Sequence, residues 1–437
     1  MEMLAKFVSE HLNDDTSRLI LDKSKWPEID MELAVNCIES RRKLKGKVSE
    51  WCMIPELIFP SSLSAEQCSS SATGRYKTAL AGRVAACCGK KEGTWKIADL
   101  TGGLGVDSWF FSQKAAAVLY NEMQERLCRA AGHNFRILGA DGISISNHCA
   151  EEGRIGDILG DFAPDIIYMD PARRGEGGKK VFLIEDCTPD ILKLQDELFR
   201  HVGHLIVKLS PMADVTMVCE RLGKHCREVH VIASGGECKE LLIWMDRNWE
   251  GGYMIIPAEI SGEETYTAFT FNAAQEKEAS PVIFNGRHPS ELQGRAFLFE
   301  PGKALMKAGA FNLVCRRFGI SKLGVSTHYY IVEDIATAAE LSDFGKLYRI
   351  NMVAGLDKRS IKAAAAACPK ADVTARNIPM DTAALQKKLG VRSGDGAHIF
   401  GLRSDVFGNL LLCTERVFKQ DLQSHSDQNQ SSDKLGL

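Results

Sequence analysis

The stretch that decides the fold is Ile97-Ala98-Asp99-Leu100-Thr101-Gly102-Gly103-Leu104-Gly105-Val106-Asp107. It begins as a short apolar run typical of a buried strand, continues as a glycine-rich turn, and leads into a helical segment. Glycines in such a turn allow unusual backbone dihedrals and a close approach of the main chain to a ligand. Because ligands of open α/β sheets bind at the carboxyl ends of the strands, the turn predicts a ligand site there.

Further apolar runs alternate with helical stretches after this turn, at residues 117–120, 135–138, 165–169 and 205–209. The alternation predicts a parallel α/β sheet with helices on both faces. The next segment differs, because the apolar runs 229–233 and 241–245 are joined through Gly235 and Gly236, which is typical of a hairpin. We therefore expect an α/β, Rossmann-like sheet that is parallel and ends in an antiparallel hairpin.

Pattern changes divide the rest of the chain. Residues 1–85 have helical periodicity, with Asp30 and Ser61 as candidate N-caps, and residues 86–250 hold the predicted sheet. Two small α+β domains are expected, at residues 251–340, with strands at 266–271 and 296–300 and a helix at 303–318, and at residues 341–419. Residues 420–437 are rich in Ser, Gln and Asp, which predicts a disordered tail.

Composition excludes several classes of protein. No apolar run approaches the length of a membrane span, and the N-terminus does not resemble a signal peptide, so we expect a cytoplasmic protein. None of the 14 cysteines forms a Cys-x-x-Cys pair. They are expected to be reduced core residues, with no metal site. The oligomeric state is left open.

The charge is unevenly distributed. The formal net charge is −3, yet residues 346–419 hold 13 Lys and Arg against 6 Asp and Glu. This asymmetry predicts a C-terminal surface that faces a polyanion, with Lys387, Lys388 and Arg392 as candidate contacts. The alternative is a lysine-rich surface that meets only solvent.

The acid before the glycines indicates which ligand the turn holds. S-adenosylmethionine (SAM) carries an ammonium and a sulfonium and no pyrophosphate, so the Asp99 carboxylate suits it better than a dinucleotide. The nicotinamide alternative also lacks its third glycine, where Ser108 stands. The cofactor-binding candidates of this segment are Asp99, Thr101, Gly102, Gly103 and Gly105.

Two further acids are expected beside the cofactor. Glu122 follows the second strand, 23 residues after Asp99, where an acid can accept both ribose hydroxyl hydrogens. Asp141 follows the run 135–138, taken as the third strand, and could accept the adenine amino hydrogen. The alternatives are a solvent-facing helix start for Glu122 and a simple turn residue for Asp141.

Asp170 and Pro171 follow the fourth strand and are the candidate catalytic residues. An Asp there can accept a hydrogen bond from a substrate N–H and aim the nitrogen lone pair at the methyl group, a positioning role that requires no metal. The next loop carries the cations Arg173, Arg174, Lys179 and Lys180, which suit a phosphate-bearing substrate unless the loop is an ordinary surface loop. Residues 208–211 are expected to form another wall.

These motifs resemble the class I SAM-dependent methyltransferases. The whole chain up to about residue 418 is similar to a bacterial methyltransferase family with a ferredoxin-like domain and a THUMP-like C-terminal domain. The matching pieces are residues 66–70, 75–77, 300–304, 307–311 and 375–379. Because THUMP domains of other enzymes bind RNA, the resemblance implies an RNA substrate, tRNA or rRNA.

One departure keeps other functions open. Amino-methylating enzymes commonly have a second proline and an aromatic residue where this chain has Ala172 and Arg173. C5-methylation of a pyrimidine would require a nucleophilic cysteine, for which Cys187 is the nearest downstream candidate. The remaining alternatives are a protein or small-molecule methyltransferase and a non-catalytic RNA-binding factor that retains SAM binding.

Overall fold

A computed structural model describes residues 2–173, 184–262, 266–294, 296–394 and 396–422. The chain divides into two compact units. The first contains residues 1–234, 239–253 and 260–265, and the second contains residues 235–238, 254–259 and 266–437. Most of the expected tail at 420–437 lies outside the described residues, as do Arg174, Lys179 and Lys180 of the cationic loop.

The N-terminal region is helical, as the periodicity predicts. The side chain of Asp30 accepts a hydrogen bond from the Leu33 amide, and that of Ser61 from the Ser64 amide, so both predicted N-caps are confirmed. The helices are α1 (Glu2–Glu10), α2 (Thr16–Leu21), α3 (Met31–Leu44), α4 (Ser49–Cys52), α5 (Ser62–Gln67) and α6 (Ser71–Cys87).

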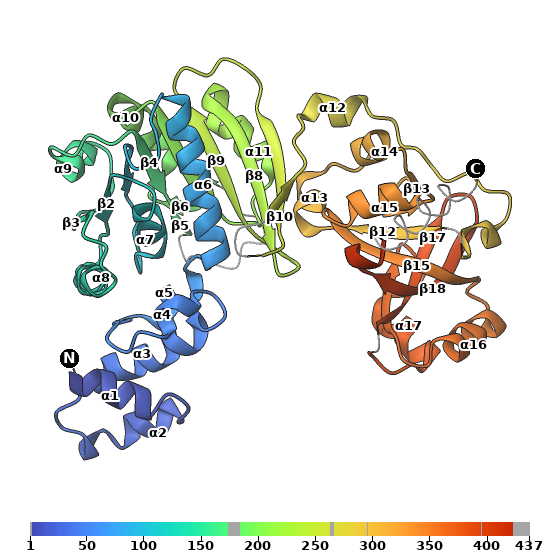
Figure 1. Ribbon diagram of the computed structural model, residues 1–437, viewed down its shortest axis with the longest axis horizontal. Helices are drawn as coiled ribbons and strands as arrows, with labels where there is room; N and C mark the ends of the chain where they lie inside the picture. The colour runs from blue at the N-terminus through green and yellow to red at the C-terminus, as the bar shows by residue number, and fades with distance from the viewer. Residues whose placement is uncertain (1, 174–183, 263–265, 295, 395, 423–437) are drawn as a thin grey trace, which may run out of the picture. The chain divides into compact units, whose positions relative to one another are not determined.

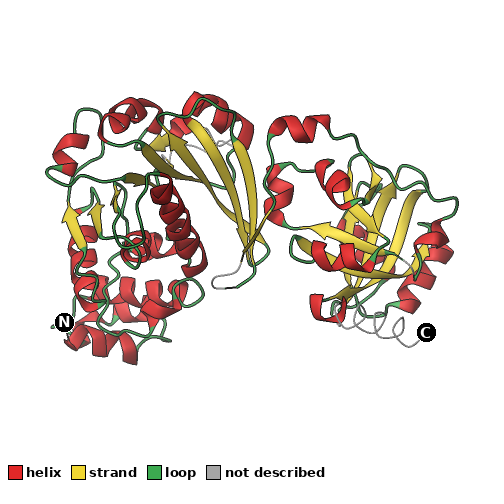
Figure 2. Ribbon diagram, turned by 45° about the horizontal axis from the view of Figure 1, so that its top comes forward, coloured by secondary structure: helices red, strands yellow, loops and turns green. Residues whose placement is uncertain are grey.

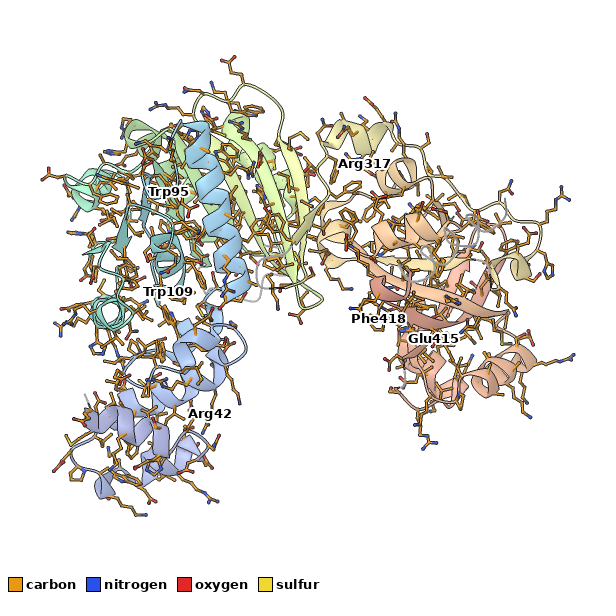
Figure 3. All side chains as sticks on the ribbon, in the orientation of Figure 1. Arg42, Trp95, Trp109, Arg317, Glu415 and Phe418 are labelled. Carbon is orange, nitrogen blue, oxygen red and sulfur yellow. The ribbon has the colours of Figure 1, made fainter. Side chains whose placement is uncertain are left out.

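These helices share a hydrophobic core with the glycine-rich turn and the helix that follows it. Trp51 and Phe59 are fully buried in the same cluster as Leu104 and Phe110. The ring of Trp109, labelled in Figure 3, meets Trp51 edge-on with 5.7 Å between ring centroids. The N-terminal helices therefore fix the turn from one side.

The sheet of the first unit confirms the expected fold class. Its strands are β1 (Lys96–Asp99), β2 (Ala117–Asn121), β3 (Ile143–Ser146), β4 (Ile166–Met169), β7 (His204–Leu209), β8 (Cys226–Ser234) and β9 (Glu237–Asp246). They belong to a nine-stranded sheet with the order β3-β2-β1-β4-β7-β9-β8-β10-β11, so the sheet continues beyond the predicted hairpin with β10 (Met254–Ile260) and β11 (Tyr266–Ala268). The first five pair in parallel, while β9 runs antiparallel to β7. Figure 1 shows α6 lying lengthwise against this sheet.

Helices and short strands connect these elements. The helices are α7 (Val106–Ser112), α8 (Glu125–Ile137), α9 (Ile155–Leu159), α10 (Ile191–His201) and α11 (Val215–Leu222). The two-residue strands β5 (Ala172–Arg173) and β6 (Cys187–Thr188) pair antiparallel directly after β4. The predicted hairpin turn is confirmed at Gly235 and Gly236, which both have positive φ.

The predicted third strand is wrong. The run at 135–138 is the end of α8, and β3 lies at Ile143–Ser146. The error has a physical cause. Phe135 packs with Ala131 and Cys128, one and two turns earlier, against Tyr120, so its apolar run is part of a helix face.

The second unit has one sheet with the order β13-β14-β12-β15-β18-β17-β16. β12 (Phe297–Pro301) and β15 (Gly345–Ala354) lie on opposite sides of the predicted domain boundary near residue 340, yet they pair antiparallel. The other strands are β13 (Ser321–Gly324), β14 (Thr327–Val332), β16 (Asp372–Arg376), β17 (Ala397–Ser404) and β18 (Gly408–Val417). Figure 2 shows the sheet in yellow with its helices in red.

The helices of this unit are α12 (Ala273–Glu278), α13 (Lys303–Ala308), α14 (Leu313–Phe318), α15 (Ile335–Leu341), α16 (Lys358–Ala367) and α17 (Thr382–Leu389). The helix predicted at 303–318 is two helices, because Gly309 adopts a left-handed conformation that ends α13. The expected strand at 266–271 is shorter, as β11 (Tyr266–Ala268), and it follows β10 (Met254–Ile260).

Candidate functional site

The turn between β1 and α7 requires its glycines. A Cβ on Gly102 would collide with the ring of Tyr120, whose hydroxyl donates a hydrogen bond to the Gly103 carbonyl at 2.6 Å. Gly103 and Gly105 have φ of 54° and 86°, and a Cβ on Gly105 would also meet the ring of Phe135. The main chain of the turn is therefore exposed to the cavity at the carboxyl edge of the sheet.

Asp99 lies behind this turn and is 1% exposed. Its carboxylate accepts hydrogen bonds from the Thr101 amide at 3.1 Å and from the Ser108 hydroxyl at 2.7 Å. Burial raises the pKa of Asp99 to about 7. Asp99 therefore joins the end of β1 to the first turn of α7, while Thr101, Gly102 and Gly103 line the cavity in front of it.

Glu122 holds the turn from the end of β2. Its carboxylate accepts hydrogen bonds from the Gly103 amide at 3.0 Å and the Gln124 amide at 2.8 Å. The side chain is buried and lines the cavity. The structure thus brings Glu122 beside the glycine turn, where the spacing predicted it.

The prediction for Asp141 is wrong. Asp141 is exposed and precedes β3, so it lies at the amino end of that strand. The carboxyl end of β3 leads instead to His148, Cys149 and Ala150, which line the cavity. The misplaced third strand caused the error, because the sequence offered no glycine or acid to mark the true strand end.

The ends of β1 and β3 are tied together by Asn121, which is fully buried. Its amide nitrogen donates to the carbonyls of Leu100 and His148, both at 3.0 Å, and its side-chain oxygen accepts from the His148 amide at 3.1 Å. The loop after β3 is therefore fixed relative to the glycine turn.

A cavity of about 720 Å³ opens at this edge of the sheet. That volume is typical of a site for a small organic ligand. Its wall includes the predicted residues 208–211, which confirms that expectation. The lining residues are Leu63, Ser64, Gln67, Cys68, Ser69, Leu100, Thr101, Gly102, Gly103, Leu104, Val106, Asp107, Glu122, Met123, Gln124, Leu127, His148, Cys149, Ala150, Asp170, Pro171, Ala172, Thr188, Pro189, Lys208, Leu209, Ser210, Pro211 and Lys239.

Asp170 reaches the cavity from the end of β4 and is paired with a lysine. Its backbone amide donates to the Thr101 hydroxyl at 2.6 Å, which ties it to the glycine turn. Its carboxylate lies 2.5 Å from the Lys208 ammonium. Burial by itself would lower the pKa of Lys208, but Asp170, Glu240 and Asp107 raise it above its usual value.

A buried charge cluster lies behind this pair, and sequence reasoning missed it. Lys77 is fully buried, with its ammonium 3.0 Å from Asp107 and 3.2 Å from Glu240. Its ammonium also donates to the Ser69 hydroxyl. The one available signal was Glu240, a charged residue at the head of an otherwise apolar strand segment.

The two acids of this cluster behave differently. Burial raises the pKa of both carboxyls, but in Asp107 the charges of Lys77 and Lys208 and the hydroxyl of Tyr168, which donates at 2.8 Å, outweigh it, so its pKa is lowered. Burial outweighs the same two lysines in Glu240, whose pKa is raised. Of the two acids, Asp107 is the one that lines the cavity.

The N-terminal helices close the cavity through α5 and the residues directly after it. Residues 63, 64 and 67–69 line the cavity, whereas Arg75, Tyr76 and Lys77 of α6 do not. Arg75 pairs with Glu50 at 2.7 Å, and the Tyr76 hydroxyl hydrogen-bonds His230 at 2.7 Å.

The predicted substrate residues are only partly described. Arg173 contributes backbone to β5, and Arg174, Lys179 and Lys180 lie outside the described residues. Cys187 is fully buried and does not line the cavity, although Thr188 does. In the second unit, Lys387 and Lys388 occupy the last turn of α17, and they and Arg392 are exposed.

Within the described residues, no three His, Cys, Asp or Glu side chains gather as a metal site would require. No helix among them has the length and apolar character needed to cross a bilayer.

Comparisons with known proteins agree with this architecture. Family models match a ferredoxin-like domain at residues 297–338 and a THUMP domain-like region at residues 345–416, which confirms the resemblance for both small domains. No curated protein matches the chain.

A solved structure matches nearly the whole chain. The crystal structure of a candidate methyltransferase from Porphyromonas gingivalis W83 is 27% identical, with a TM-score of 0.80, over 95% of this chain and 98% of that one. An rRNA methylase from Streptococcus thermophilus is 11% identical with a TM-score of 0.29, over 40% of this chain and 94% of its own. The chain has a methyltransferase fold.

The raised pKa of Asp99 predicts a pH-dependent stability. A carboxyl that holds its proton more tightly in the folded than in the unfolded state stabilises the fold at low pH, and this contribution is lost as pH rises through about 7. The free energy of unfolding of the wild type, relative to Asp99→Asn, should fall between pH 5 and 7 by about 1.4 kcal/mol per unit. Urea unfolding of both proteins at several pH values measures this difference. The exposed Asp141→Asn is the control, and a pH-independent difference for Asp99→Asn would contradict the assignment.

Proposed function

We propose that this protein is a SAM-dependent methyltransferase that acts on RNA. The observation that carries the proposal is the cavity at the carboxyl ends of β1, β2 and β4, where a glycine turn, a buried acid and a paired aspartate meet. This edge is where open α/β sheets bind nucleotide-like ligands.

The cofactor half of the cavity suits SAM by shape and charge. The backbone of Gly102 and Gly103 lines the cavity, and the space beside Gly103 is open, so the methionine end can approach the main chain closely. Glu122 faces the same space and can accept hydrogens from the ribose hydroxyls. The carboxylates of Glu122 and Asp107 favour the cationic cofactor over one with phosphates.

The adenine end is assigned to the loop after β3 in place of Asp141. His148, Cys149 and Ala150 line the cavity there, and Asn121 holds the loop in position. Asp99 acts through the turn: its hydrogen bonds to Thr101 and Ser108 set the conformation of the glycines. When bound, SAM supplies a methyl group already activated by its positive sulfur.

Acceptor positioning is assigned to Asp170, with Pro171 shaping the backbone after it. Asp170 projects into the cavity from a strand end that Thr101 ties to the glycine turn, so cofactor and acceptor sites share one rigid frame. Positioning of this kind supplies much of the catalysis of a displacement on an activated methyl group.

The RNA substrate rests on the second unit. Its residues 345–416 match a THUMP-like domain, and THUMP domains of other enzymes bind RNA. The exposed cations Lys387, Lys388 and Arg392 provide contacts for phosphates. We assign them to RNA binding and the cavity to the chemistry, with tRNA or rRNA as the substrate class.

Cofactor binding is expected to depend on the glycine turn and Glu122. In isothermal titration calorimetry, Gly102→Ala and Glu122→Gln should each weaken SAM binding at least about 10-fold. The added methyl group of Gly102→Ala would collide with the Tyr120 ring and displace the turn, and Glu122→Gln removes a charged acceptor. Asp141→Asn is the matched control and should bind within about 2-fold of wild type, since Asp141 lies at the opposite edge. Equal affinities for Glu122→Gln and Asp141→Asn would contradict this cofactor site.

Methyl transfer is expected to require Asp170. Labelled methyl groups from SAM should enter total RNA from a strain that lacks the gene, and Asp170→Asn should reduce the rate by about 10² to 10⁴-fold while SAM binding is retained. Label that enters protein or small molecules but not RNA would refute the RNA acceptor. SAM binding without transfer to any acceptor would instead indicate a non-catalytic role.

RNA affinity is expected to depend on the three C-terminal cations. Replacing Lys387, Lys388 and Arg392 together by Gln should weaken RNA binding and lower the slope of log affinity against log salt by about 2 to 3, because each lost contact releases about one counterion fewer. Filter binding at several salt concentrations measures both. A charge-matched control replaces Lys6, Lys23 and Lys45, exposed residues of the N-terminal region. Equal slopes for the two triple variants would refute the assignment.

A further inference from the structure

Asp170 does not face the cavity alone. Its carboxylate lies 2.5 Å from the Lys208 ammonium, and their side chains are 33% and 13% exposed. Both residues line the cavity. An acceptor atom that reaches Asp170 therefore also meets a fixed positive charge.

Buried acids interact with the Lys208 ammonium and stabilise its charge. The carboxylates of Asp107 and Glu240 act on Lys208 and, together with Asp170, raise its pKa above the usual value for lysine. Both acids are buried, and both also contact the ammonium of Lys77. Lys208 therefore stays protonated at neutral pH and cannot serve as a base, so the carboxylate of Asp170 remains the proton acceptor of the pair.

A fixed cation beside the acceptor distinguishes between acceptor atoms. Methylation of a neutral amine builds positive charge on nitrogen, which the Lys208 ammonium would oppose. Methylation of a hydroxyl builds negative charge on oxygen as its proton leaves, which the same ammonium would stabilise. Preorganised charges of this kind act most strongly in a site with little water.

The described lining of the cavity is compatible with a ribose acceptor. Among the described residues it contains Leu, Met and Pro side chains but no Phe, Tyr or Trp on which an extruded base would stack. A hydroxyl on the ribose backbone needs no stacking platform, since the sugar is already at the surface of the RNA. The choice of acceptor atom therefore rests on the charge of Lys208.

We propose that the acceptor is the 2′-hydroxyl of a ribose in RNA, with Asp170 as the proton acceptor and Lys208 as the cation that stabilises the developing charge on oxygen. The acceptor oxygen forms a bond to the methyl carbon while the carbon–sulfur bond breaks and its electron pair stays on sulfur. The hydroxyl proton passes to the Asp170 carboxylate and then to water. This inference rests on the proposed RNA methyltransferase function and names its acceptor atom.

The chemical position of the label in RNA tests it directly. RNA methylated by the wild-type protein with labelled SAM is hydrolysed in alkali, which cleaves beside every free 2′-hydroxyl. A 2′-O-methyl group blocks that cleavage, so the label should appear in dinucleotides. Label in mononucleotides would place the methyl group on a base and overturn this inference while leaving an RNA methyltransferase. No label in RNA would overturn the proposed function itself.

Variants of Lys208 test the second assignment. Lys208→Met should lower the transfer rate at least about 100-fold. Lys208→Arg, which keeps the charge, should recover part of that loss. SAM affinity, measured by calorimetry, should stay within about 3-fold of wild type in both, which also shows that each variant is folded. Equal transfer rates for Lys208→Met and Lys208→Arg would contradict a role for the charge.

Discussion

The site depends on a buried ammonium. Lys77 is fully buried on α6 and contacts Asp107 on α7, Glu240 on β9 and the Ser69 hydroxyl, so one charge joins the N-terminal helices to the central sheet. Removing one partner of such a buried pair costs about 3–5 kcal/mol, because the other charge is left without compensation. The helical region before the sheet is therefore part of the candidate site: it supplies a wall of the cavity and the charge that pairs with the acids beside Lys208.

A second set of hydrogen bonds connects the carboxyl ends of the neighbouring strands to one another. Thr101 accepts a hydrogen bond from the Asp170 amide, Glu122 accepts one from the Gly103 amide, and Asn121 bridges the ends of β1 and β3. Each is a polar side chain at or just after the carboxyl end of a strand, and each hydrogen-bonds to the main chain of a neighbouring segment. A shift of one strand end would therefore move its neighbours, and the glycine turn keeps the geometry that a closely approaching ligand needs.

The sequence predicted those parts of the site whose residues directly follow a strand along the chain. The glycine turn, Glu122 and Asp170 each follow an apolar run directly, so strand ends could be found from the pattern alone. Asp141 failed because Phe135 belongs to a helix face that mimics a strand over four residues. The Lys77–Glu240 contact could not be predicted, since its partners are 163 residues apart and only the folded chain brings them together. The domain boundary predicted near residue 340 rests on a change in the sequence pattern. That pattern does not show that β12 and β15, on either side of the boundary, pair in one sheet.

The cavity must attract a cationic cofactor and also stabilise negative charge that develops on the acceptor. The cofactor proposed here is cationic, and the acids Glu122 and Asp107 line the cavity beside the glycine turn. The acceptor proposed here becomes more negative as it reacts, and the ammonium of Lys208 stands beside Asp170 to meet it. Asp107 serves both demands, because its carboxylate faces the cavity and also acts on Lys208. In the proposed mechanism, losing the charge of Asp107 would reduce the attraction for the cofactor and also weaken the electrostatic interaction that keeps Lys208 protonated, so this one buried acid would couple cofactor binding to methyl transfer.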